Sequence, residues 1–159
     1  MPWTGGWRTT CTGCSAHRAF RTLTARPDLR PRLAASTGLD EVTLDAIAAQ
    51  ARAVADWLSA QGYPRLHLEL PLQQVAPDGS ETNAILDILA EGDQGLMILD
   101  QKSGACLDPA ARFAGYLPQL AAYADLAAAA TGKPVDGIAV FWMSEGMISV
   151  APAPAVVGA

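Results

Sequence analysis

Apolar residues recur along the chain with two different spacings, and the change of spacing outlines the secondary structure. Spacing of the helical kind predicts helices over residues 13–25, about 40–60 and about 110–130. Short apolar runs bounded by glycine and proline predict strands over residues 65–75, 84–89, 96–102, 135–142 and 147–150. Prolines at positions 27 and 31 make the stretch up to Gly38 a loop or a short broken helix.

The order of these elements is helix, helix, three strands in a meander, helix and two strands. It predicts one α/β domain with a mixed central sheet flanked by helices. We expect residues 1–12 to be irregular, residues 13–150 to form the domain and residues 151–159 to form a flexible tail. Half of the 159 residues are hydrophobic, which is enough for a full core.

The first predicted strand alternates well enough to assign its faces. Leu66, Leu68, Leu70 and Leu72 are expected on one face, with the intervening His67 and Glu69 on the other face. Pro71 cannot donate a backbone hydrogen bond, so the later half of this strand should lie at a sheet edge or a bend.

The second and third predicted strands carry the most informative polar residues. The turn over residues 91–95 has two glycines and suits a hairpin of four or five residues, which would bring Asp87 and Asp100 together. Two carboxylates among apolar residues are costly to bury without a partner. A divalent cation between them would remove their repulsion.

Lys102 adds a cationic group to the expected metal site of Asp87 and Asp100. Side chains alternate along a strand, so Asp100 and Lys102 should share one face while Gln101 points to the other. Two carboxylates, a backbone carbonyl and an ammonium group around one point suit phosphodiester hydrolysis with a metal ion. The alternative is an ordinary hairpin with one exposed Asp–Lys pair.

The spacing of these residues is similar to the motif of the PD-(D/E)XK nucleases, in particular the RecB-like exonuclease domains of RecB- and AddA-type subunits. Asp87 is followed after thirteen residues by Asp100-Gln101-Lys102 and then by Ser103-Gly104. The chain has Ala84 where this family usually has glycine, and Gln101 where it usually has tyrosine. Neither difference removes a metal ligand.

Further steps of the sequence resemble the same domains. Gly13 and His17 match a Gly-x-x-x-His step whose histidine sits at the metal, and Glu69 followed by Pro71 matches a step on the first core strand. His67 is more simply explained as structural.

A last matching step follows the lysine strand, on the third predicted helix. Gln119 and Tyr123 match a Gln-x-x-x-Tyr step and lie four residues apart, on one face of the helix. Taken singly, each of these steps is a weak signal. Tyr116 lies one turn earlier on the same helix.

The resemblance implies a restriction-endonuclease-like βββαβ core and a metal-dependent DNA exonuclease. The residues it implies as metal ligands are His17, Asp87, Asp100 and the Gln101 carbonyl, for Mg²⁺ or alternatively Mn²⁺. Lys102 would assist the attacking water.

The same resemblance implies a supporting set around these residues. Glu69 would be a further acid or a support for Lys102, while Gln119 and Tyr123 would orient the DNA or hydrogen-bond the acids. The family works in double-strand-break repair and recombination, so a helicase–nuclease partner subunit is expected. The alternatives are a non-catalytic DNA-binding or assembly module with this fold, and a restriction-type endonuclease.

The distribution of charge along the chain bears on how it could bind DNA. The net charge is −5, but residues 1–38 carry +5, leaving −10 for the rest. The acidic bulk argues against tight DNA binding by the chain alone, and the basic start could contact a DNA backbone or an acidic partner, or could simply be solvated.

Other sequence features exclude or favour particular classes of protein. Three cysteines, at positions 11, 14 and 106, are too few for a zinc or iron–sulfur site and fit free thiols in a reducing cytoplasm. Gly132-Lys133-Pro134 lacks the pattern of a phosphate-binding loop, so no ATP site is expected. No apolar run is long enough to predict a membrane span.

Overall fold

The structure is a computed structural model that describes residues 12–153, without the side chains of residues 12–15 and 17. The helical elements are α1 (Thr12–Ala25), η1 (Pro27–Leu29), α2 (Arg30–Thr37), α3 (Glu41–Ala60) and α4 (Pro109–Thr131). The sequence therefore predicted the three long helices, and the broken-helix alternative for the stretch after Pro27 is confirmed. Asp40 begins α3 by accepting a hydrogen bond from the Thr43 N–H, as an N-cap does.

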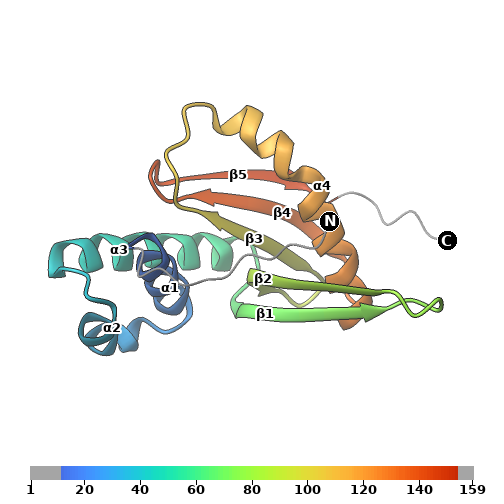
Figure 1. The fold of residues 1–159 in the computed structure, drawn as a ribbon, viewed down its shortest axis with the longest axis horizontal. Coiled ribbons are helices and arrows are strands. Elements are labelled where there is room, and N and C mark those ends of the chain that lie inside the picture. The colour runs from blue at the N-terminus through green and yellow to red at the C-terminus, as the bar shows by residue number, and fades with distance from the viewer. Residues whose placement is uncertain (1–11, 154–159) are drawn as a thin grey trace.

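Five strands form one sheet in the order β1-β2-β3-β4-β5 (Figure 1). They are β1 (Arg65–Val75), β2 (Glu81–Glu91), β3 (Leu96–Lys102), β4 (Val135–Trp142) and β5 (Met147–Pro152). All neighbours are antiparallel except β3 and β4, which are parallel and connected through α4. The predicted α/β fold with a mixed sheet is confirmed, and β5 continues two residues further than expected.

Helices cover both faces of the sheet, and each face has its own hydrophobic core. Figure 1 shows α1, α2 and α3 at the left and α4 at the right of the view. Phe20 of α1 stacks on Phe141 of β4 at 4.7 Å between ring centroids, which fixes α1 against the first face. Leu120 and Ala124 of α4 pack with the fully buried Trp142 on the second face. These two anchors hold α1 and α4 on either side of the end of β3.

The predicted faces of β1 are wrong in one respect. Leu66 and Leu68 pack into the core under α1 and α3, but Leu70 and Leu72 pack into the core under α4. The change occurs at Glu69, whose φ of +48° is in the left-handed region that L-residues seldom adopt. Regular alternation would keep all four leucines on one face, so this residue interrupts the pleat and turns the outer half of β1 over.

The hairpin between β2 and β3 has the predicted turn length. β2 ends at Glu91 and β3 begins at Leu96, and the Gly92 N–H donates to the Gly95 carbonyl at 2.9 Å. Gly95 packs so closely on Asp136 that a Cβ there would lie 1.9 Å from a carboxylate oxygen. Among residues 12–153, none of the helices has the length and apolar character that a bilayer crossing demands.

Candidate metal-dependent active site

The centre of the site is the point where β2 and β3 separate. Their ladder pairs Ile88 with Leu99, and the next facing residues are Asp87 and Asp100, where no further pair forms. Instead, the Gln101 N–H donates to Asp87 Oδ2 at 2.9 Å. The N–H and C=O of one residue in a strand point to the same side, so the Gln101 carbonyl faces this gap as well.

Asp100 and Lys102 share one face of β3, as the alternation predicted. Lys102 Nζ lies 2.7 Å from Asp100 Oδ2, while the Gln101 side chain turns to Met143 on the opposite face. Asp100 Oδ2 is buried and has no hydrogen bond of acceptable geometry, despite this short ionic contact. Lys102 also lies 4.5 Å from the centroid of the Tyr116 ring on α4, a cation–π contact.

The protonation of this pair reflects its burial. Burial raises the pKa of the Asp100 carboxyl, the contact with Lys102 opposes the shift, and the charge of Asp87 adds to it. Burial alone would lower the pKa of the Lys102 ammonium, but the contact with Asp100 outweighs this effect and the pKa is raised. Lys102 is therefore a cation at neutral pH. It lies beside the Asp100 carboxyl group, whose ionisation is made costly by burial.

Glu69 is linked to the site by an ion pair with Arg21. The sequence suggested that Glu69 could instead support Lys102. Arg21 Nη2 lies 2.6 Å from Glu69 Oε1, and Arg21 Nη1 lies 3.0 Å from Asp87 Oδ1. In the β1–β2 register Glu69 and Asp87 are the facing positions where the ladder skips a pair. His67 is turned away and contacts Glu91 at 2.9 Å, in agreement with the structural role predicted for it.

Gln119 and Tyr123 both face the site from α4. Gln119 Nε2 donates to the Tyr123 hydroxyl at 2.6 Å, so the two side chains are joined to each other. The Gln-x-x-x-Tyr step thus forms one hydrogen-bonded unit on the wall of the site. Its proposed action on DNA stays a prediction.

His17 lies on α1, but its side chain is outside the part of the chain that the structure describes. Its proposed role as a metal ligand therefore stays a prediction. Cys11 and the side chain of Cys14 are also outside that part, whereas Cys106 is a free, buried thiol.

One cleft of about 780 Å³ brings these groups together. Its walls include Glu69, Asp87, Asp100, Gln101, Lys102, Gln119 and Tyr123. Three arginines that the sequence reasoning did not place here also line it, namely Arg18, Arg21 and Arg112. Four cations thus face three carboxylates, so the cleft is formally positive in a chain of net charge −5.

Two of these arginines had a signal in the sequence. Arg21 follows His17 by four residues and Gly13 by eight, which is the spacing of one helical face. Arg112 precedes Tyr116 by four residues and Gln119 by seven, so it shares the helical face of the Gln-x-x-x-Tyr step.

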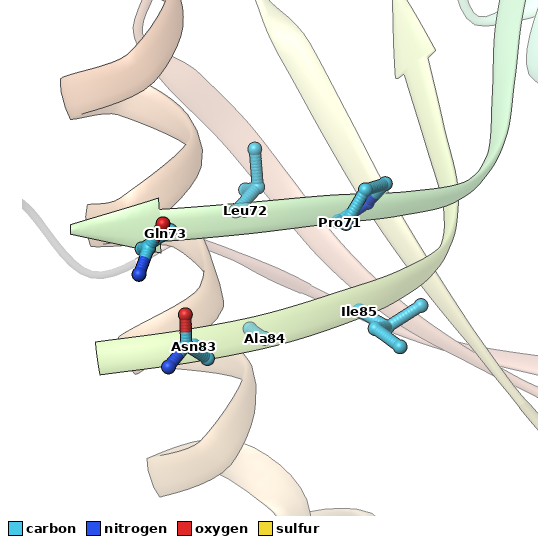
Figure 2. Close-up of a pocket in the computed structure, with 6 residues that line it drawn as sticks. All are labelled: Pro71, Leu72, Gln73, Asn83, Ala84 and Ile85. Carbon is cyan, nitrogen blue, oxygen red and sulfur yellow. The ribbon is translucent and has the colours of Figure 1, made fainter. Parts of the chain in front are cut away.

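A second hollow of about 550 Å³ lies on the outer half of the β1–β2 hairpin. Figure 2 shows the side chains that line it, which are Pro71, Leu72, Gln73, Asn83, Ala84 and Ile85. None of them is ionisable, so these side chains offer no group for acid–base chemistry. Ile85 also lines the 780 Å³ cleft, so the two hollows adjoin at this residue.

The residues of the cleft fit a hard divalent cation. Asp100 offers a buried oxygen without a hydrogen bond, and Asp87 and the Gln101 carbonyl offer further oxygen atoms. Among the side chains that the structure describes, which do not include those of Cys14 and His17, no three His, Cys, Asp or Glu side chains converge as a complete metal site. This donor set suits a divalent ion that binds one or two carboxylates and keeps several waters.

Comparisons with known proteins agree with this geometry. A family model described as the PD-(D/E)XK nuclease superfamily matches residues 9–153. No curated protein gives a significant match. A crystal structure of a protein from Eubacterium rectale, named only provisionally as an exonuclease, superposes with a TM-score of 0.55 at 14% identity, over 96% of this chain and 62% of that one.

A second crystal structure, of protein VC1899 from Vibrio cholerae, matches with a TM-score of 0.37 at 10% identity, over 86% of this chain and 50% of that one. The chain thus spans less than two thirds of the length of either protein. At these identities the first superposition supports the fold.

Proposed function

The chain belongs to the PD-(D/E)XK nuclease superfamily, and from that premise we propose that it is a metal-dependent DNA exonuclease domain of the RecB/AddA type. The observation that carries the proposal is the meeting of Asp87, Asp100 and Lys102 at the point where β2 and β3 separate. Asp87, Asp100 and the Gln101 carbonyl would hold the ion, with His17 as a further ligand. Mg²⁺ is the expected ion and Mn²⁺ the alternative.

The ion, when bound, makes a water more acidic and neutralises charge on the scissile phosphate. Lys102 is held between Asp100 and the Tyr116 ring, where its ammonium can orient the attacking water and stabilise developing negative charge. The Gln101 N–H fixes the rotamer of Asp87 by holding Oδ2. Gln119 and Tyr123 line the cleft from α4, where they would orient the DNA.

The charge of the cleft supports a polyanionic substrate. Arg18, Arg21 and Arg112 line a cleft whose formal charge is positive, although the chain as a whole is acidic. The four cations exceed the three carboxylates by one charge, and a bound divalent cation would add two more, so the field in the cleft attracts anionic ligands. An acidic surface outside the cleft would weaken binding elsewhere, so we propose that a helicase-type partner subunit delivers the DNA during double-strand-break repair.

The experiment that tests this function compares linear and closed-circular DNA in Mg²⁺, in Mn²⁺ and in EDTA. Both DNAs are incubated with the wild-type chain and with Asp100→Asn and Lys102→Met. The chain has two lysines, and Lys133 is also paired with a carboxylate, so Lys133→Met is a control with the same charge change outside the cleft.

We expect metal-dependent shortening of end-labelled linear DNA by the wild type and by Lys133→Met. Both cleft variants should be slower by roughly 10³-fold or more, as for the loss of a metal ligand or a charge-stabilising group. Nicking of closed circles would instead indicate an endonuclease. Absence of cleavage under all conditions would leave two interpretations: a nuclease domain that depends on its motor subunit, or a non-catalytic DNA-binding or assembly module with the nuclease fold.

A further inference from the structure

Arg21 connects the two acids that face each other across β1 and β2. Its guanidinium contacts Glu69 Oε1 at 2.6 Å and Asp87 Oδ1 at 3.0 Å, and 16% of its side chain is exposed. The neighbouring Phe20 is buried against Phe141, so the position of Arg21 on α1 is fixed by the core. The contact is thus part of the packed domain.

This contact occupies the oxygen of Asp87 that the fold leaves free. Oδ2 already accepts the Gln101 N–H, and Oδ1 accepts Arg21 Nη1. Asp100 differs, because its Oδ2 has an ionic contact with Lys102 but no hydrogen bond. A divalent ion binding between the two aspartates would therefore compete with Arg21 at Asp87.

The guanidinium can leave Asp87 without losing its other ion pair. Its contact with Glu69 uses a different nitrogen, and Nε is buried without any hydrogen-bond partner. Its single positive charge offsets part of the charge of the two acids whenever no metal is present. A guanidinium and a divalent ion side by side at Asp87 would repel each other.

We propose that Arg21 is a positioning residue that takes the place of the divalent cation at Asp87, holding Asp87 and Glu69 together in the absence of metal and withdrawing to Glu69 when the ion binds. This exchange rests on the proposed function, because it requires a metal site at Asp87 and Asp100. It makes metal affinity weaker than the acids alone would give, and it stabilises the protein without metal.

The test uses the full chain with Arg21→Met, and Arg18→Met as the matched control. Arg18 lies on the same helix and lines the same cleft, but the described side chains give it no ion pair, so its loss has the same effect on net charge alone. Mn²⁺ affinity is measured by calorimetry, and Tm is measured in EDTA. Neither readout depends on cleavage.

We expect Arg21→Met to bind Mn²⁺ about tenfold more tightly than Arg18→Met, since a cation directly on a ligand oxygen has been removed. Its Tm in EDTA should be lower than that of Arg18→Met by several degrees, and saturating Mn²⁺ should close this gap. Arg21→Lys keeps the charge but cannot contact both acids through two separate nitrogens. Its Mn²⁺ affinity should lie between those of Arg21→Met and the wild type. If Arg21→Met does not fold, the Mn²⁺ affinity of Arg21→Lys compared with that of the wild type still tests the proposal.

Two results would overturn the proposal, and they differ in what else they overturn. The first result is that the wild type binds Mn²⁺, but Arg21→Met binds it no more tightly than Arg18→Met does. This result would reject the exchange and leave the metal-dependent function standing. Failure of every form to bind Mn²⁺ would reject the exchange and the proposed function together.

Discussion

Strands β1 and β2 contribute to two charged clusters that differ in how far their acids are paired. Near the β2–β3 turn, Glu91 contacts Lys133 at 2.5 Å, His67 at 2.9 Å and Arg65 at 3.6 Å. Four residues earlier on β2, Asp87 belongs to the cleft cluster with Glu69, Asp100 and two cations. The first cluster has one central acid among several basic groups, whereas in the second, among the described side chains, only two cations, Arg21 and Lys102, make ion pairs with three acids.

The pKa shifts of the two clusters have opposite signs. Hydrogen bonds from Lys133 and His67 lower the pKa of Glu91 to about 2. Burial raises the pKa of Asp100, even with Lys102 in contact. The comparison teaches that ion pairs alone do not mark a functional site. A cluster that its own residues satisfy stabilises the hairpin, whereas a buried acid left without a hydrogen bond indicates that a group from outside completes the site.

The largest expected effect concerns the backbone at Glu69, the member of the cleft cluster at which the regular pleat of β1 is interrupted. Glu69→Gly and Glu69→Ala both remove the carboxylate, but only glycine adopts a φ of +48° without strain. We expect Glu69→Gly to be more stable than Glu69→Ala by about 1 kcal/mol. Urea denaturation of both variants measures the difference.

His67, a member of the Glu91 cluster on the same strand, supplies the control. Its φ is not among the positive values of the described chain, so glycine should be the less stable of the two substitutions there, by about 0.5–1 kcal/mol. Equal stability of Glu69→Gly and Glu69→Ala would mean that the pleat changes faces without backbone strain.

This kink also marks the limit of prediction from the sequence. Turn residues and apolar runs were enough to predict the hairpin, the sheet and the meeting of Asp87, Asp100 and Lys102, because a strand has a fixed period. The positive φ of Glu69 had no signal, since glutamate has no preference for that region. Without it, regular alternation assigned Leu70 and Leu72 to the wrong core.

The contacts of Arg21 illustrate a second limit. Helical spacing could place Arg21 on the same face as His17, but the acids it contacts come from two other elements, 48 and 66 residues away. Such pairings depend on how α1 packs on the sheet. The Glu91 cluster escaped prediction for the same reason, because Lys133 reaches Glu91 from the loop after α4.

A smaller effect should distinguish the two clusters by the stability of their ion pairs. Asp100→Leu with Lys102→Met replaces both charges of the cleft pair by hydrophobic side chains, and Glu91→Gln with Lys133→Met removes both charges at the turn. We expect Tm in EDTA to rise by about 2 °C for the cleft variant, because replacing a buried ion pair by hydrophobic residues of similar volume is often neutral or stabilising. The turn variant should melt below the wild type. Shifts of the same sign in both variants would contradict the distinction.

The smallest effect is the dependence of stability on pH, for which the two clusters predict opposite slopes. Glu91 has a lowered pKa, so its contribution is complete above its ordinary value of 4.5 and is lost as the pH falls towards about 2. Asp100 has a raised pKa, so the folded chain holds its proton more tightly than the unfolded chain, and acidification from neutral pH first stabilises the protein. Thermal melts in EDTA between about pH 7 and about pH 2.5 measure both slopes. Glu91→Gln should flatten only the acid end of the curve, and Asp100→Asn only the rise that precedes it. A loss of both features in one variant would show that the two clusters titrate together, against the separation that their contacts indicate.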